Sequence, residues 1–306
     1  MENVQDVLLA VSTWVGLAGI FVVGGAGLFR LAVWSRAASQ VPLRPREVEQ
    51  VFGRRWTQLV VVTWLLAAAG TLSSFILSED WSAEGLRVAL VVLPAVAWPL
   101  RRRLRGGLMR PGPAHSGGRS IPAGPGVERT SPYGGGAEAG LRRALDAACI
   151  LALLVAAALA GHARGSSTPI PNLAVALVHV AGIAAWAGGL VALLAVAFPA
   201  ARVVDEPKRV RVLAPVVARF SDIAVAAVFA IVASGVYSSW AEVRTLDALI
   251  GSSYGLVFLG KLAVFVPAVA LGAVNNRWTR PRLLQAARED RPAPRALAML
   301  RRSVAM

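Results

Sequence analysis

The stretch LAVALVHVAGIAAWAGGLVALLAVAFP, residues 173–199, decides the fold class of this chain. It contains no Asp, Glu, Lys or Arg, and as a helix it would extend for about 40 Å at 1.5 Å per residue. A transmembrane helix needs about 20 apolar residues to cross roughly 30 Å of hydrocarbon. The stretch therefore predicts a helix that crosses a lipid bilayer.

Further apolar segments along the chain predict helices of the same kind. They are residues 7–29, 57–77, 87–100, 145–161, 220–240 and 254–274. The segment 87–100 is short, so we expect it to span only if residues 81–86 extend it and Arg87 snorkels to the surface. With 56% hydrophobic residues, 16% charged residues and a mean hydropathy of +0.59, the chain is predicted to be an all-α, polytopic transmembrane bundle of about seven spans.

Basic residues predict the orientation of the bundle. The segments 30–56, 101–143, 202–211 and 277–306 hold 27 of the 32 Lys and Arg residues, and they alternate with loops that hold almost none. Because cytoplasmic loops carry the basic excess, we expect the N-terminus outside and the C-terminus in the cytoplasm. The net charge of +15 then belongs to a membrane protein in contact with lipid, and we expect no nucleic-acid partner.

A segment rich in Gly, Pro and Ser divides the predicted bundle into two parts. We interpret residues 106–140 as a disordered cytoplasmic linker between a membrane unit at 1–105 and a second one at 141–276, with a basic cytoplasmic tail at 277–306.

Matching motifs follow in the same order in both membrane units. The pairs are residues 18–20 with 181–183, 55–57 with 219–221, 69–75 with 234–240 and 94–97 with 267–270. The order predicts a tandem three-helix repeat, parallel in the membrane, with the helix at 145–161 as an extra element.

Two histidines are the strongest candidates for chemistry, because ionisable groups inside a membrane are costly. His162 ends the fourth predicted helix at the outer surface, as a metal ligand or as an interfacial histidine. His179 lies about 10 Å deep in the fifth, as a metal ligand or hydrogen-bonded to a neighbouring helix. Only a short loop separates the two helices, so both imidazoles can bind one metal ion. The single cysteine, Cys149, excludes a Cys-x-x-Cys site.

Four further residues are expected to shape this site. Trp186 follows His179 on about the same helix face, and Gly188 and Gly189 permit close helix approach. Lys261 enters the seventh helix at a depth near that of His179, where it either gates a cation or snorkels outward. Towards the cytoplasm, Arg219 and Asp222 are expected to pair with each other.

Several motifs in the second half resemble the copper resistance protein D (CopD) family of bacterial inner-membrane proteins. They are Gly161-His162-Ala163, His179 with Trp186-Ala-Gly-Gly-Leu190, Arg219-Phe220-Ser221, Ser234-Gly235, Tyr254-Gly255 with Lys261, and Leu271-Gly-Ala-Val-Asn275. Gly24-Gly25, Leu28-Phe29-Arg30 and Gly85-Leu-Arg87 resemble the family's first helices more weakly.

The resemblance implies that the protein moves or handles a copper ion at the periplasmic face of the plasma membrane, beside a periplasmic copper carrier. His162 and His179 inherit the role of copper ligands. Imidazoles suit copper, and two of them favour transient capture over storage. Two alternatives stay open: an accessory or assembly protein for a copper-dependent partner, and a haem b electron-transfer subunit, since membrane histidines also ligate haem. No Ser-His-Asp order, Walker loop, His-Glu-x-x-His motif or dinucleotide glycine pattern occurs at a plausible position, so we do not expect an enzyme.

Overall fold

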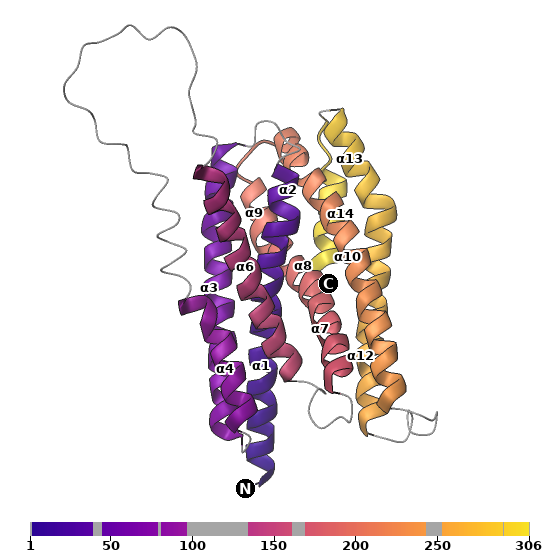
Figure 1. The fold of residues 1–306 in the computed structure, drawn as a ribbon. Helices are drawn as coiled ribbons and strands as arrows, with labels where there is room; N and C mark the ends of the chain where they lie inside the picture. The colour runs from indigo at the N-terminus through magenta and orange to yellow at the C-terminus, as the bar shows by residue number, and fades with distance from the viewer. Residues whose placement is uncertain are drawn as a thin grey trace, which may run out of the picture.

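The computed structural model describes residues 2–38, 45–78, 81–96, 134–160, 169–242, 253–289 and 291–305. All regular structure within these ranges is helical, and they contain no strand. The predicted all-α class is therefore confirmed for the described residues. The long helices run side by side as a bundle, with the N-terminus at one end (Figure 1).

Several long helices are interrupted by short π-helical segments, labelled η, in which the helix widens locally. The N-terminal half contains α1 (Glu2–Leu28), η1 (Phe29–Trp34), α2 (Ser35–Ala38), α3 (Arg46–Leu77) and α4 (Trp81–Val96). Next come α6 (Gly134–Leu159), α7 (Pro169–Ile183), η3 (Ala184–Gly188), α8 (Gly189–Ala192), η4 (Leu193–Ala197) and α9 (Phe198–Ala201). The chain continues through α10 (Glu206–Glu242), α12 (Ser253–Val274), η5 (Asn275–Thr279), α13 (Arg280–Arg288) and α14 (Pro294–Ala305).

Five helical stretches of the described residues are long and apolar enough to cross a membrane. They are Val4–Ala37, Arg46–Leu77, Pro171–Ala201, Glu206–Ser239 and Gly255–Arg288. The protein is thus a multi-pass membrane protein, and these stretches coincide with five of the predicted spans. The other two predicted spans fall on α4, which has 16 residues, and on α6, which carries Arg142, Arg143 and Asp146. A total of seven spans stays a prediction.

Helix α4 corrects the prediction for Arg87. The helix begins at Trp81, so residues 81–86 do extend the short segment. Arg87 does not snorkel, however: its side chain is only 1% exposed and forms an ion pair with Glu84. Its Nη1 donates to both carboxylate oxygens of Glu84, and its Nε donates to the carbonyl oxygen of Ala156 on α6 at 3.3 Å. Glu84, one helical turn away inside the protein, thus solvates the Arg87 charge in place of the water at the membrane surface.

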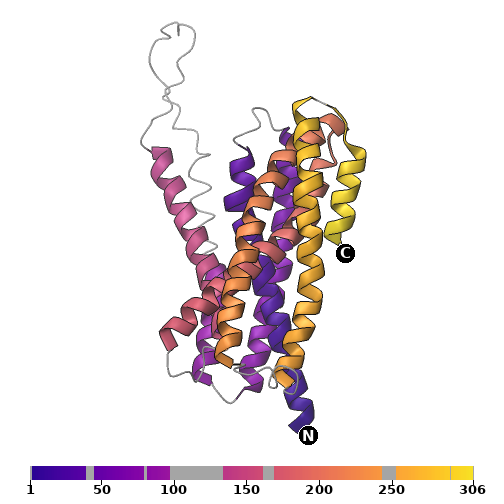
Figure 2. The same ribbon diagram turned by 90° about the vertical axis from the view of Figure 1, so that its right-hand side faces the viewer.

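The two segments predicted to lack membrane helices contain helical structure. Helix α6 begins at Gly134, so the last seven residues of the predicted linker 106–140 are helical, and residues 106–133 lie outside the described part. The predicted tail 277–306 continues the long helix through α13 and then turns back as α14, seen in yellow at the side of the bundle (Figure 2). Leu283 and Leu300 bury the apolar faces of these two helices in the core.

The turn from α9 to α10 is closed by polar contacts. Arg209 donates from Nε to the carbonyl oxygen of Ala201 at 3.3 Å and from Nη2 to that of Val204 at 3.2 Å. Lys208 pairs with Asp205 at 2.9 Å, and this contact lowers the pKa of Asp205. The lowered pKa keeps the Asp205 carboxylate charged well below neutral pH, so the ion pair persists there.

Helix α1 packs against α3 through glycines that bring the two backbones together. A Cβ atom on Gly19 would lie 2.6 Å from the carbonyl oxygen of Thr63, and one on Gly70 would lie 2.6 Å from the Cα atom of Gly16. Gly182 of α7 has the corresponding place against α10, where a Cβ atom would lie 3.0 Å from the carbonyl oxygen of Ala227. Small residues at such crossings are typical of membrane helices.

Helix α1 also meets η3, and this contact is reciprocal. The motif match of residues 18–20 with 181–183 is a shift of 163 positions, which carries Phe21 onto Ala184 and Gly25 onto Gly188. A Cβ atom on Gly25 would collide with the carbonyl oxygen of Ala184, and one on Gly188 would collide with that of Phe21. Exchanging each of the four residues for its counterpart in the other unit thus gives the same two contacts. This is the pattern that a two-fold axis produces.

One pair of π-helical segments, η1 and η4, follows the same shift. Residues 30–34 of η1 are carried onto η4, Leu193–Ala197. In the first unit Trp56 donates from Nε1 to the carbonyl oxygen of Ala26 at 3.4 Å. In the second unit Phe220, the counterpart of Trp56, lies against Gly189, the counterpart of Ala26. The parallel repeat remains a prediction, and these matched contacts support it.

Substitution of Gly25 tests the contact between the two units. We expect Gly25→Ala to destabilise the protein by about 1–3 kcal/mol, because the methyl group collides with the η3 backbone and the helices must separate. The control is Gly260→Ala on α12, where an added Cβ meets nothing within 4 Å. Thermal unfolding in detergent, followed by fluorescence-detected gel filtration, measures both. Equal unfolding temperatures for the two variants would contradict the glycine contact.

Removal of one partner tests the buried ion pair. Glu84→Ala leaves the Arg87 charge without its counter-ion inside the protein, and we expect a loss of about 3–5 kcal/mol of stability. The double variant Glu84→Leu with Arg87→Met should recover much of this loss, because no buried charge remains. Asp205→Ala removes an exposed pair of the same spacing and should hardly change the unfolding temperature. Equal stability of Glu84→Ala and of the double variant Glu84→Leu with Arg87→Met would argue against a buried ion pair.

Candidate metal site

The structure describes one of the two predicted copper ligands. His179 lies in α7, and its side chain is half-buried. His162 lies in residues 161–168, outside the described part of the chain, so the meeting of the two imidazoles stays a prediction. Within the described ranges, no three His, Cys, Asp or Glu side chains form a group that could hold a metal ion.

His179 faces α10 and contacts Ser234. Its Nδ1 lies 3.0 Å from the Ser234 Oγ atom, and its Cε1 would lie 3.8 Å from a Cβ atom on Gly235. Ser234 is 5% exposed. The lack of a side chain at Gly235 gives the imidazole room between the two helices. The expected hydrogen bond from His179 to a neighbouring helix is therefore present at Nδ1.

The serine fixes the tautomer of the imidazole. The Ser234 hydroxyl has one hydrogen, and its Oγ lies 2.5 Å from the carbonyl oxygen of Ala230, to which it donates. It must then accept a hydrogen bond from Nδ1–H of His179. Neutral His179 is thus protonated at Nδ1 and has its lone pair on Nε2, the nitrogen that can bind a metal ion.

Trp186 links the histidine helix to α12. It lies in η3, and its ring packs edge-on against Phe265 with centroids 5.4 Å apart and an angle of 80° between the planes. Lys261 is exposed one turn before Phe265, on about the same face of α12. Counted along the two helices from this ring contact, His179 and Lys261 differ in level by about 5 Å.

The two predicted site-shaping glycines lie at backbone contacts. Gly188 packs on Gly25 of α1, and a Cβ atom on Gly189 would lie 2.6 Å from Cε2 of Phe220 on α10. They bring α1 and α10 close to the widened segment η3. Neither glycine is described in contact with His179, so they act on the site through the placement of η3 and Trp186.

A polar cluster near the middle of α10 corrects a second prediction. Asp222 does not pair with Arg219: it accepts a hydrogen bond at 2.7 Å from Arg280, which begins α13. Arg280 also donates to the Oδ1 of Asn276 at 3.1 Å, as does Ser221 at the same distance. Arg219 donates instead to the carbonyl oxygen of Ala32 at 3.4 Å. The helix continues past Asn276, which brings Arg280 within reach of Asp222.

Residues 214–306, from α10 to the C-terminus, match the family described as Copper resistance protein D. The chain is 32% identical over 128 residues to a Bacillus subtilis (strain 168) protein named Copper transport protein CutJ. That alignment covers 42% of this chain and 23% of the relative, so the chain spans less than a quarter of that relative's length. No solved structure matches the chain significantly. The CopD resemblance seen in the sequence is thus confirmed for residues 214–306.

Substitution of Ser234 tests the tautomer. In the parent protein we expect the nitrogen-15 shifts of neutral His179 to show a protonated Nδ1 and an unprotonated Nε2. Ser234→Ala removes the acceptor and should give a mixture of tautomers, whereas Ser238→Ala, one turn further along α10, should leave the spectrum unchanged. A parent spectrum with the proton on Nε2 would show that the serine does not orient the ring.

Proposed function

We propose that this protein transports or handles copper across the plasma membrane, with capture of a copper ion by His162 and His179 at the extracytoplasmic face. The observation that carries the proposal is the hydrogen bond from His179 Nδ1 to Ser234, because an imidazole that donates from Nδ1 has its lone pair on Nε2, a nitrogen with which histidine binds copper. The family match supports copper as the cargo, since a related protein bears the name of a copper transporter.

The ligand chemistry suits brief binding of copper. Imidazole nitrogen binds copper ions well, and two imidazoles can hold Cu(I) in linear coordination. Ser234 is an outer partner of the kind that orients metal-binding histidines. Because two ligands leave the ion weakly held, the site favours capture and release over storage.

The inner half of the unit formed by α7, α10 and α12 offers a second polar region. Ser234 and Ser221 are 13 residues apart on α10, about 20 Å along the helix. The rings of Trp186 and Phe265 lie about 10 Å below His179, between these two levels. In our proposal these rings close the passage, and copper moves from the histidines towards Ser221 and Asn276 when they separate.

The orientation follows from the positions of the basic residues. The segments rich in Lys and Arg face the cytoplasm, which places the N-terminus and His179 towards the outside. A periplasmic copper carrier would then deliver the ion to the outer end of α7. The accessory role differs from transport in one measurable respect: copper would bind at the histidines but would not accumulate inside the cell.

Copper uptake by cells tests the capture site. We expect the double variant His162→Ala with His179→Ala to lose copper accumulation, because no imidazole remains at the outer face. His115→Ala, which changes the third histidine in the predicted linker, should accumulate copper like the parent. Ser234→Ala should weaken copper binding about 10- to 100-fold, as loss of an outer partner does.

The outcomes separate the possible functions. Parental uptake by the double histidine variant, at equal expression, would refute capture by these residues. If the double variant lost copper binding but cells with the parent protein did not accumulate copper either, the accessory role would be favoured. A haem absorption spectrum from the purified parent protein would instead identify an electron-transfer subunit.

A further inference from the structure

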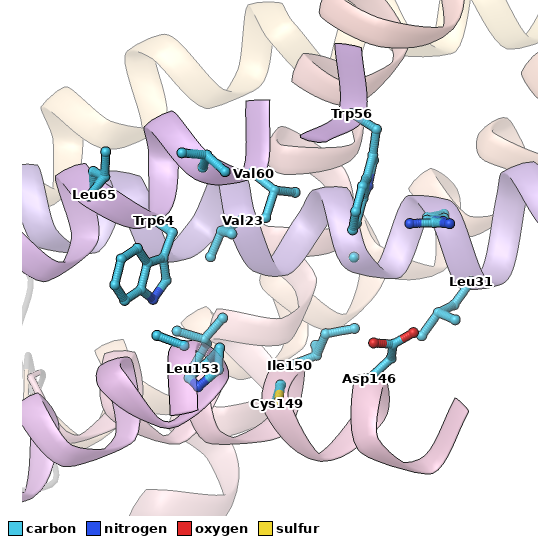
Figure 3. Close-up of a pocket in the computed structure, with 15 residues that line it drawn as sticks. Val23, Leu31, Trp56, Val60, Trp64, Leu65, Asp146, Cys149, Ile150 and Leu153 are labelled. Carbon is cyan, nitrogen blue, oxygen red and sulfur yellow. The ribbon is translucent and has the colours of Figure 1, made fainter. Parts of the chain in front are cut away.

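A pocket of about 300 Å³ lies between α1, α3, α4 and α6, away from the histidine helix. Its lining includes Leu31, Trp56, Trp64, Leu65, Asp146 and Leu153 (Figure 3). Its volume is at the lower end of those that hold small ligands. Neither the copper site nor the packing of the two units makes use of this space.

The pocket opens sideways towards lipid. Val61 and Leu65 of α3 belong to its wall, and yet 44% and 54% of their surfaces are exposed. Both lie within a stretch apolar enough to cross the membrane. Pro94 and Ala95, from the last turn of α4, line it from another side. A ligand therefore enters from the bilayer and has to be a lipid-soluble molecule.

The wall of the pocket is apolar at one end and polar at the other. Asp146 and Leu31 lie at one end, and Trp64 and Leu65 lie at the opposite end (Figure 3). The indole Nε1 of Trp64 donates to the carbonyl oxygen of Val91 at 2.9 Å, so the ring presents apolar surface to the pocket. Such a polarity gradient fits an acyl chain that ends in a headgroup.

Arginines make the polar end positive. Arg30 lines the pocket, and its guanidinium carbon lies 4.2 Å from the centre of the Trp56 ring. Arg142 and Arg143 lie on α6 within about one turn of Asp146. The three arginines outnumber Asp146, so the mouth attracts negative charge. Basic pockets between membrane helices are known to bind anionic lipid headgroups.

We propose that this pocket holds an acyl chain of an anionic phospholipid, whose phosphate lies against Arg30 in the leaflet at the basic end of the bundle. A helix from another protein is excluded by size, because a helix with side chains is about 10–12 Å across. A zwitterionic lipid would gain less from the arginines than an anionic one, because its headgroup sets a cation beside the phosphate. Bound lipid fills the gap beside α4 and joins α3 to α6 at this level.

Native mass spectrometry of the full chain tests the proposal. The protein is reconstituted in vesicles of phosphatidylglycerol and phosphatidylcholine in equal amounts, extracted in mild detergent and weighed with its retained lipid. We expect the parent to retain phosphatidylglycerol. Val61→Trp fills the opening of the pocket towards lipid and should lose this lipid. Val62→Trp changes the adjacent exposed position, which lies outside the pocket wall, and should retain it.

A second variant tests the headgroup. Arg142→Gln with Arg143→Gln lowers the positive charge of the mouth and should reduce the preference for phosphatidylglycerol, so that the two lipids are retained more equally. Equal retention of lipid by Val61→Trp and the parent would overturn the pocket as the binding site. Retention of phosphatidylcholine in preference to phosphatidylglycerol by the parent would overturn the anionic headgroup. Both outcomes are independent of copper binding.

Discussion

The backbone contact between α1 and η3 is the constraint on which the arrangement of the bundle depends. Gly25 and Gly188 lie so close that neither position has room for a side chain. Gly25 meets Ala184, and Gly188 meets Phe21, the counterpart of Ala184 in the first unit. In a membrane, burial of apolar surface gives little drive for helix association, so close packing of backbones has to supply it. The two helical units are therefore held together where their side chains are smallest.

Comparison of the two units explains where the histidine site lies. The shift of 163 positions carries Gly16 onto His179, and the matched motifs carry Gly70 onto Gly235. In the first unit, Gly16 and Gly70 bring α1 and α3 into backbone contact. In the second unit, the His179 imidazole lies against Gly235 and is hydrogen-bonded to Ser234, which is the counterpart of Ala69. The same helix crossing thus serves packing in one unit and holds an imidazole in the other.

The sequence predicted the features that depend on local composition and missed those that depend on distant partners. Hydropathy predicted the five long apolar helices, and the motifs of the second half predicted the CopD resemblance. The partners of Arg87, His179 and Asp222 were not predictable, because Ala156, Ser234 and Arg280 are 55 to 69 residues away in the sequence. For Arg87 the general cost of burying a charge argued for the surface. The Glu at i−3 was the available signal that the charge is paired within the helix.

Helix α12 is the element whose position is least fixed by packing, and it belongs to the segment that matches the CopD family. None of residues 256–274 is buried, and the described contact between its apolar surface and η3 is the ring pair of Phe265 with Trp186. At its inner end, η5 and α13 are tied to α10 through Asn276 and Arg280. Segments with few buried contacts open at the lowest free-energy cost. A passage beside His179 would therefore open by displacement of the outer part of α12, with the polar cluster around Asp222 as the fixed end.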